Sequence, residues 1–228
     1  MKKYLTLGLV LILAALANAQ TFRPDMRLLI TGDEDIAMSH KELGKLFPEK
    51  LKDPFPYIAV FEKDGKPKLI YLAAEHTKER TFDMVDYIYK NFNPQIAVVE
   101  WERTGRDLNT CEGGSPREAA YSAARASDNN IPFILSDLAD KEKYEISGFS
   151  ENYISDPLVS YKREVFMIEN ITAALNTYDV VYAVFGEWHY LAQRKILEQM
   201  LGKPYYIWKN SEDVPFKKIN DCRTVSVR

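Results

Sequence analysis

Carboxylates and histidines follow short apolar runs at four places in this chain of 228 residues. Runs of this length, rich in Val, Ile and aromatic residues, predict buried β-strands. The carboxyl ends of parallel strands share one edge of a sheet, which is where open α/β sheets bind ligands. We therefore expect one site to contain the residues that follow Leu69–Ala73, Ile96–Val99, Phe133–Leu135 and Val180–Phe185: Glu75, His76, Glu100, Asp137, Glu187 and His189.

These residue types suit either divalent-metal binding or proton transfer, since imidazole and carboxylate groups do both. His76 and His189 carry most weight because they are two of only three histidines and both follow predicted strands. An acidic residue at a strand end is more often a helix cap or a solvated loop residue. For Glu75, Asp137 and Glu187 the sequence leaves a substrate-binding role and an ordinary surface role both open.

The motifs of several enzyme classes are absent from the sequence. It contains no HExxH, no paired CxxC, no GxSxG, no P-loop and no GxGxxG after a strand. Cys111-Glu112-Gly113-Gly114 places two glycines before a helix start, but a flexible turn explains them better than a phosphate site. The mildly acidic composition, with a net charge of −3 and no basic patch, argues against a nucleic-acid partner.

Helices and strands must alternate to position these residues. Asp64-Gly65, between two β-rich runs at Tyr57–Phe61 and Leu69–Ala73, predicts a hairpin near the amino end. Apolar residues at helical spacing predict four helices, and a last strand follows them. The helices are Thr77–Phe92, one that starts at Ser115-Pro116-Arg117-Glu118 and runs to Ser127, Leu158–Leu175 and Leu191–Leu201, and the last strand is Tyr205–Trp208. This order predicts a single α/β domain over 20–228, with a mainly parallel sheet flanked by helices.

Two segments have weaker patterns. Residues 20–56 show no firm element, although Ser39 and Glu42 resemble the start of a short helix, in which His40 would be solvated. The polar segment 138–156 predicts a long loop or a small cap over the sheet, and such segments are often functional.

The amino terminus predicts export. Lys2 and Lys3 precede an apolar run from Leu5 to Leu16, and Ala17-Asn18-Ala19 forms a cleavage pattern, so residues 1–19 read as a signal peptide. The apolar run is too short for a stable membrane anchor. We therefore expect a periplasmic or secreted protein, in which Cys111 and Cys222 either pair or remain free thiols.

Four short motifs resemble a known superfamily. It joins TraB/TIKI-type metal-dependent proteases, ChaN-like haem-binding lipoproteins and erythromycin esterases. The similar segments cover roughly Leu69 to Gly202 and are LAAEH ending at His76, VVE ending at Glu100, YKREVFMIENI from Tyr161 to Ile171, and FGEWH ending at His189.

The resemblance implies a metal-dependent active site. Two GxxH motifs, a glutamate and an arginine mark this site in the TIKI-like branch. They match His76, His189, Glu100 and Arg163, so the resemblance implies a divalent Mn, Co or Zn ion held by His76, Glu100 and His189. Arg163 would then stabilise negative charge. Two positions depart from the family: Glu164 replaces an aspartate and Ala73 a glycine, and an alanine would crowd a turn that needs positive φ.

Three functions follow as alternatives. The first is a hydrolase of the TraB/TIKI-like class that acts on a peptide or ester bond, with a peptide or small molecule as its substrate. The second is a ChaN-like protein that binds haem or another small ligand, with tyrosines of 138–156 or His76 as ligands. The third, which Ala73 favours, is an inactive interaction domain on the same fold.

Overall fold

The computed structural model describes residues 21–47, 55–76, 80–102 and 117–208, together with the backbone of 108–109 and 224–225. The predicted signal peptide, both cysteines and the predicted helix start at Ser115 lie outside these ranges and stay predictions. Within the described ranges no helix is long and apolar enough to cross a membrane.

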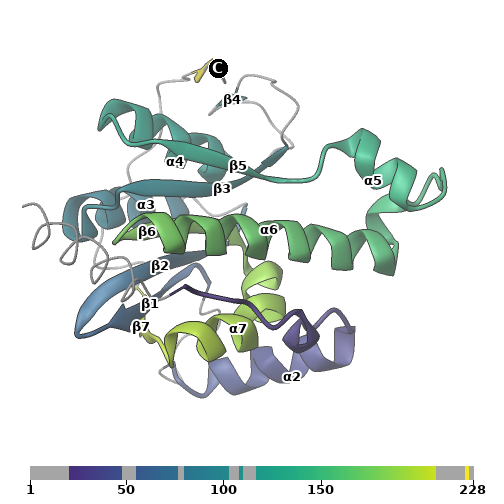
Figure 1. The fold of residues 1–228 in the computed structure, drawn as a ribbon, viewed down its shortest axis with the longest axis horizontal. Coiled ribbons are helices and arrows are strands. Elements are labelled where there is room, and N and C mark those ends of the chain that lie inside the picture. Colours follow the sequence, from purple (N-terminus) through teal and green to yellow (C-terminus); the bar gives the residue numbers. More distant parts are fainter. Residues whose placement is uncertain are drawn as a thin grey trace, which may run out of the picture.

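A six-stranded sheet forms the centre of the fold, with strand order β5-β3-β6-β2-β1-β7. Strands β5, β3, β6 and β2 are mutually parallel, while β1 is antiparallel to both of its neighbours. The predicted α/β fold with a mainly parallel sheet is therefore confirmed (Figure 1). The strands are β1 (Tyr57–Lys63), β2 (Lys66–Ala74), β3 (Ile96–Glu102), β5 (Phe133–Asp137), β6 (Val181–Gly186) and β7 (Tyr205–Ile207), and β4 (Leu108–Asn109) pairs separately with β8 (Thr224–Val225).

The predicted hairpin is also confirmed. Strands β1 and β2 pair from Tyr57 opposite Ala73 to Lys63 opposite Lys66. Asp64 and Gly65, at the turn, have φ values of 51° and 72°. Asp and Gly tolerate these left-handed values better than other residues, so this dipeptide sets the register of the hairpin.

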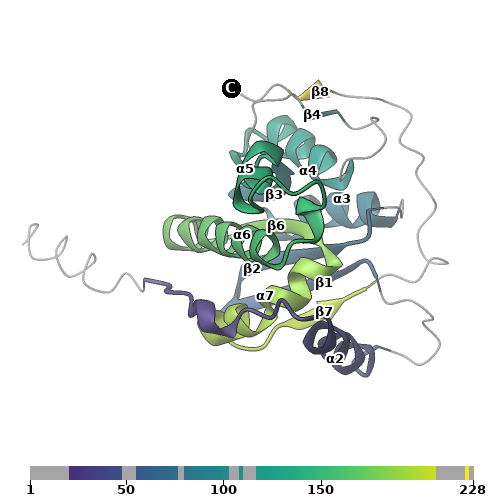
Figure 2. The same ribbon diagram turned by 90° about the vertical axis from the view of Figure 1, so that its right-hand side faces the viewer.

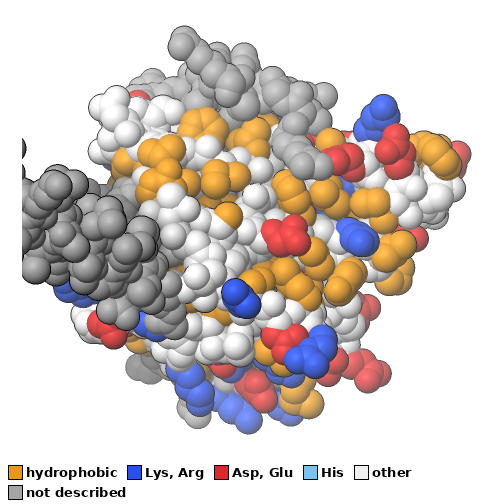
Figure 3. All heavy atoms as spheres, in the orientation of Figure 1, with side chains coloured by type: hydrophobic (Ala, Val, Ile, Leu, Met, Phe, Trp, Pro, Cys, Tyr) orange, Lys and Arg blue, Asp and Glu red, His pale blue; other side chains and the backbone are white. Residues whose placement is uncertain are grey.

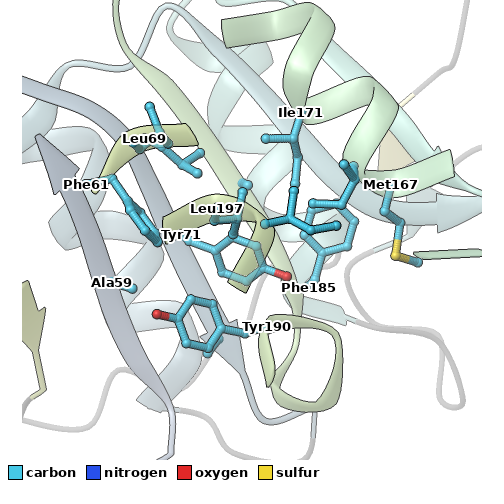
Figure 4. Close-up of a cluster of buried hydrophobic side chains, with 14 of the residues drawn as sticks. Ala59, Phe61, Leu69, Tyr71, Met167, Ile171, Phe185, Tyr190 and Leu197 are labelled. Carbon is cyan, nitrogen blue, oxygen red and sulfur yellow. The ribbon is translucent and has the colours of Figure 1, made fainter. Parts of the chain in front are cut away.

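Helices cover both faces of the sheet (Figures 1 and 2). Alternate strand residues point to opposite faces, so Tyr71 and Ala73 enter one core while Ile70 and Leu72 enter the other. The first core packs against α6 and α7, and α2 lies against α7; Figure 4 shows part of it. The second packs against α3 and α4. These helices are α2 (Asp33–Gly44), α3 (Arg80–Phe92), α4 (Arg117–Asp128), α6 (Pro157–Thr177) and α7 (Glu187–Leu201).

Helix α7 begins four residues before the predicted start at Leu191, so the predicted boundary is wrong. Gly186 is the extended N-cap residue, and Glu187 adds an acidic side chain to the first turn. A negative charge there is stabilised by the helix dipole. His189 is therefore a helix residue rather than part of a loop.

The amino-terminal segment is more ordered than its sequence pattern predicts. A short 3₁₀ turn, η1 (Met26–Leu28), precedes α2, whose first turn contains three acidic residues. Ser39 is buried inside α2, so its predicted role as an N-cap is wrong. The ring of His40 packs edge-on against Phe55, with centroids 5.0 Å apart, rather than being only solvated.

The segment 138–156 is a helical cap rather than a long loop. It contains α5 (Asp140–Ile146) and the 3₁₀ turn η2 (Tyr153–Ser155). Figure 1 shows α5 beyond the carboxyl ends of β3 and β5. Figure 3, in the same orientation, shows apolar side chains next to charged ones on this face of the protein. Exposed members of this cap include Phe149 and Ile154.

One buried hydroxyl offers a test of the core. The side chain of Tyr57 is fully buried, and its hydroxyl has no hydrogen-bond partner among the described residues, whereas the Tyr182 hydroxyl lies 2.8 Å from Ser122 Oγ. We expect Tyr57→Phe to raise the free energy of unfolding by about 1 kcal/mol, because it removes an unsatisfied polar group. Tyr182→Phe should lower it by about 1 kcal/mol, because it breaks a made hydrogen bond. Urea denaturation measures both, and equal losses in the two variants would contradict the prediction.

Candidate active site

The carboxyl edge of the sheet brings together residues from four neighbouring strands. Glu100 lies within β3, Asp137 ends β5, Gly186 ends β6, and His76 follows the end of β2 by two residues. The sheet order makes these four strands adjacent. The side chains at their ends can therefore contact one another directly.

Glu100 is the centre of this cluster. Its Oε1 atom lies 3.1 Å from His189 Nε2 and 3.4 Å from Arg163 Nη2. Its Oε2 atom accepts a hydrogen bond of 2.6 Å from the backbone amide of Gly186 and lies 3.9 Å from His76 Nε2. All three of the other residues predicted to be catalytic thus surround one buried carboxylate.

Two further glutamates orient the imidazoles. Glu118, from α4, lies 2.5 Å from His76 Nδ1. Glu164, from α6, pairs with His189 Nδ1 and also accepts a 2.7 Å hydrogen bond from Gln193. Because a carboxylate accepts the Nδ1 proton of each ring, both Nε2 atoms are directed to Glu100.

The sequence contained a signal for one of these two glutamates. Glu118 is 1% exposed, but the residues that follow it on the same side of α4 are Tyr121, Ser122 and Arg125, which form no apolar stripe. Glu164 shares the inward face of α6 with Ile168 and Ile171. An acidic residue within an apolar helical stripe needs a buried partner, so this pattern points to a site. Glu164 appeared in the sequence analysis only as a departure from the family motif.

Arg163 is held by a pair of hydrogen bonds. Its Nε and Nη2 atoms lie 2.9 and 3.0 Å from the two oxygens of Asp137. Asp137 also forms an ion pair with Lys143, a buried residue of the cap helix α5, whose Nζ atom lies 2.9 Å from Asp137 Oδ2. Asp137 therefore orients Arg163 and links the cap to the cluster. Its substrate-binding role stays a prediction.

Glu75 and Glu187 do not line the pocket that contains this cluster, although both follow predicted strands and were expected to lie in the site. Glu75 is half-buried, and its carbonyl accepts a hydrogen bond from Thr81. Glu187 lies in the first turn of α7. Neither side chain lines the pocket that contains the two histidines. Residues two apart on a helix point in very different directions, so His189 faces the cluster while Glu187 does not.

Ala73 does not disturb the site. It lies inside β2, opposite Phe185 of β6, and its side chain enters the core. Among the described residues the non-glycine positions with positive φ do not include Ala73. The expected crowding of a turn is therefore wrong, because no turn occurs at this position.

Charges within the cluster shift the pKa values of its members. Burial opposes ionisation of Glu100, but His189, His76 and Arg163 outweigh it and hold the pKa of Glu100 well below its usual range. Burial also disfavours a charged His189, yet Glu164 and Glu100 raise its pKa to about 10. Glu118 raises the pKa of His76 against the effect of burial. His189 is thus an imidazolium at neutral pH.

A pocket of about 400 Å³ opens onto the cluster. Its floor consists of the two histidines with Glu100, Arg163 and Glu164. The side chain of His76 is 44% exposed whereas that of His189 is 12% exposed, so His76 is the more accessible imidazole. The tyrosines Tyr144 and Tyr153 of the cap, considered as haem ligands, do not line this pocket.

Part of the wall of the pocket comes from residues 20–56, to which the sequence pattern gave no role. Ile30, Thr31, Asp33 and Ile36, from the amino-terminal segment, form one wall. Trp188, Ala192 and Ser160, from α7 and α6, form the rest. Nothing in the local pattern of residues 20–56 indicates this position, because it depends on the packing of α2 against α7.

Imidazole and carboxylate, the donor types of this cluster, are those that bind divalent cations. Four carboxylates of the cluster are buried, on Glu100, Glu118, Asp137 and Glu164, and the basic side chains paired with them include Arg163 and Lys143. Either two protons on the imidazoles or one divalent ion balances the remaining charge. Imidazoles whose Nδ1 atoms bond to carboxylates are also typical of metal sites. In the described part of the chain these groups do not form a preassembled cluster of three ligands, and Glu100 and His189 bond to each other.

Gly186 is required for space rather than for its backbone angles. A Cβ atom at this position would lie 2.8 Å from His76 Nε2, whereas the φ of −52° suits any residue. We expect Gly186→Ala to push the imidazole out and to lower the pKa of His76 toward its ordinary value, as measured by NMR titration. Gly44→Ala, where a Cβ meets nothing within 4 Å, is the control. An unchanged His76 pKa in Gly186→Ala would contradict this account of the contact.

The paired state of His189 makes stability depend on pH. Because its pKa is raised from 6.5 to about 10 on folding, its contribution to stability is complete below pH 6.5 and is lost as the pH rises toward 10. We expect the difference in free energy of unfolding between the metal-free protein and its His189→Gln variant to shrink across this range. Urea denaturation at stepped pH in the presence of a chelator measures it. A constant difference from pH 6.5 to 10 would show that His189 is not held as an imidazolium.

Comparison with known proteins identifies no relative. No family model, no curated protein and no solved structure matches this chain. The motif resemblance stays a prediction, and the geometry of the cluster is the basis for assigning a function.

Proposed function

We propose that this protein is a hydrolase that activates a water molecule at Glu100, His76 and His189 and cleaves a peptide or ester bond. One observation carries the proposal: two imidazoles face a single buried carboxylate, and each is fixed by its own glutamate. Such fixed tautomers and shifted pKa values are typical of catalytic acid–base groups and of metal ligands. A purely structural cluster would not need a pocket above it.

His76 is the proposed general base. With its Nδ1 proton donated to Glu118, its Nε2 atom can accept a proton. This imidazole is also the more exposed of the two. A water molecule beside it would lose a proton to Nε2 as its oxygen attacks the carbonyl carbon of the substrate.

His189 and Arg163 would serve the later part of the reaction. The proton on His189 Nε2 would pass to the leaving nitrogen or oxygen as its bond to carbon breaks. The Nη1 atom of Arg163 makes no hydrogen bond within the described residues, although Nε and Nη2 do. It can therefore donate to the oxyanion while Asp137 keeps the guanidinium in place.

The same residues would hold a divalent Mn, Co or Zn ion. When bound by His76, Glu100 and His189, such an ion would lower the pKa of a water molecule and polarise the scissile carbonyl. His189 must lose its Nε2 proton for this, since the proton and the ion compete for one atom. The proposal agrees with the resemblance to TraB/TIKI-type proteases and with the predicted export to the periplasm or the medium.

Turnover by purified protein tests the function. The chain beginning at Gln20 is incubated with a mixed peptide library and with p-nitrophenyl esters, with added Mn²⁺, Co²⁺ or Zn²⁺ or with a chelator. We expect cleavage, and we expect Glu100→Gln to lower kcat/KM by about 100-fold or more, because acid–base and metal chemistry both lose their central carboxylate. Glu169→Gln, on the exposed side of α6, is the matched control and should keep full activity.

Two outcomes would overturn the proposal. One is the absence of turnover under every metal condition, and the other is equal activity of wild type and Glu100→Gln. The metal-dependent form makes a separate prediction: the affinity for the ion rises with pH, because binding displaces the proton of His189. Activity that persists in the presence of a chelator would support the acid–base form of the proposal and contradict the metal-dependent form.

A further inference from the structure

The pocket has a floor and a rim of different character. Every ionisable side chain of the floor bonds to another protein group. The rim side chains Thr31, Asp33, Ser160 and Trp188 line the same pocket, and within the described residues they make no side-chain hydrogen bond or ion pair. The ionisable groups of the floor are therefore paired within the protein, whereas the polar groups of the rim are available to bind a ligand.

The rim combines one carboxylate with one aromatic ring. Asp33 is exposed in the first turn of α2, and Trp188 is 54% exposed in the first turn of α7. Both residues line the same pocket, and the helices that carry them, α2 and α7, pack against each other. Tryptophan side chains are usually more buried than this one. The exposed ring of Trp188 gives the pocket an electron-rich face, which attracts cations.

The charge at the rim of the pocket favours a cationic ligand. Among the described residues that line the pocket, the positive charges, on Arg163 and on the imidazolium of His189, lie on the floor, where they are paired with Asp137, Glu164 and Glu100. Asp33 is the ionisable side chain among the described residues of the rim. A cationic ligand would therefore be attracted to the rim and an anionic ligand repelled by it.

The rim also has an apolar part. Ile30 and Ile36 line the pocket beside Asp33 and are nearly buried. A volume of about 400 Å³ holds a compact group rather than a long folded segment. A complementary ligand has a positive charge close to a small apolar or aromatic group.

We propose that this pocket binds a protonated amine attached to an apolar group, with the ammonium at Asp33 and the face of Trp188 and the apolar group against Ile30 and Ile36. The amine belongs either to a small molecule or to the amino terminus of a peptide. The inference deepens the proposed function by naming its substrate class, and it is tested by binding alone, without turnover.

Calorimetric titration with three probes of one shape is the test. Phenethylammonium, 2-phenylethanol and phenylacetate differ chiefly in charge, and we expect affinity to fall in that order. Asp33→Asn should weaken phenethylammonium by about five-fold, the scale of a partly exposed ion pair, and leave 2-phenylethanol unchanged. Asp35→Asn, on the same helix but outside the pocket, is the matched control. Trp188→Leu should weaken the cation by a few-fold, and Trp188→Phe by less.

A second pair of probes separates the two sources of the amine. Phe-Ala amide and its N-acetyl form differ only in the amino-terminal charge; preference for the free amine supports a peptide amino terminus, and equal affinity assigns the site to small amines. No binding of phenethylammonium, equal binding of all three phenyl probes, or equal effects of Asp33→Asn and Asp35→Asn would each overturn the proposal. A hydrolase that cleaves neutral and cationic substrates alike would overturn it while sustaining the proposed function.

Discussion

The ionised side chain of Glu100 is the constraint on which the rest of the site depends. A carboxylate removed from water is costly unless charges and hydrogen bonds replace its solvation. The Gly186 amide, His189, Arg163 and His76 supply that replacement from four other parts of the fold: the end of β6, α7, α6 and the segment after β2. The charged side chains among these partners are themselves paired: Arg163 with Asp137, His189 with Glu164 and His76 with Glu118.

Two chains of contacts result from this requirement. One runs from Arg163 to Asp137 and on to Lys143, which ties the cap helix α5 to the sheet. The other runs from His189 through Glu164 to Gln193, whose side-chain oxygen accepts a hydrogen bond from the buried Tyr71. Buried polar groups linked in this way hold a single arrangement firmly, since moving one leaves others unpaired. This rigidity suits a catalytic floor.

Protonation and stability are coupled at this floor. The buried carboxylates of the cluster outnumber Arg163 and Lys143, which favours protonation of the imidazoles in the folded state. Within the described residues the rim side chains Thr31, Asp33, Ser160 and Trp188 make no hydrogen bond or ion pair to this buried network. A substitution at the rim would therefore leave the charges that surround Glu100 in place.

The sequence by itself determined the α/β fold and the positions of His76, Glu100 and Asp137, because the carboxyl ends of parallel strands share one edge whatever packs around them. Arg163 was indicated only by a motif resemblance. The tertiary structure decided the rest. Glu118, Glu164 and Lys143 enter the site from helices, and the direction of a helix side chain depends on the rotation of that helix against the sheet. The same reason separates His189 from Glu187: the two are neighbours along the chain, but the docking of α7 directs only the first of them to Glu100.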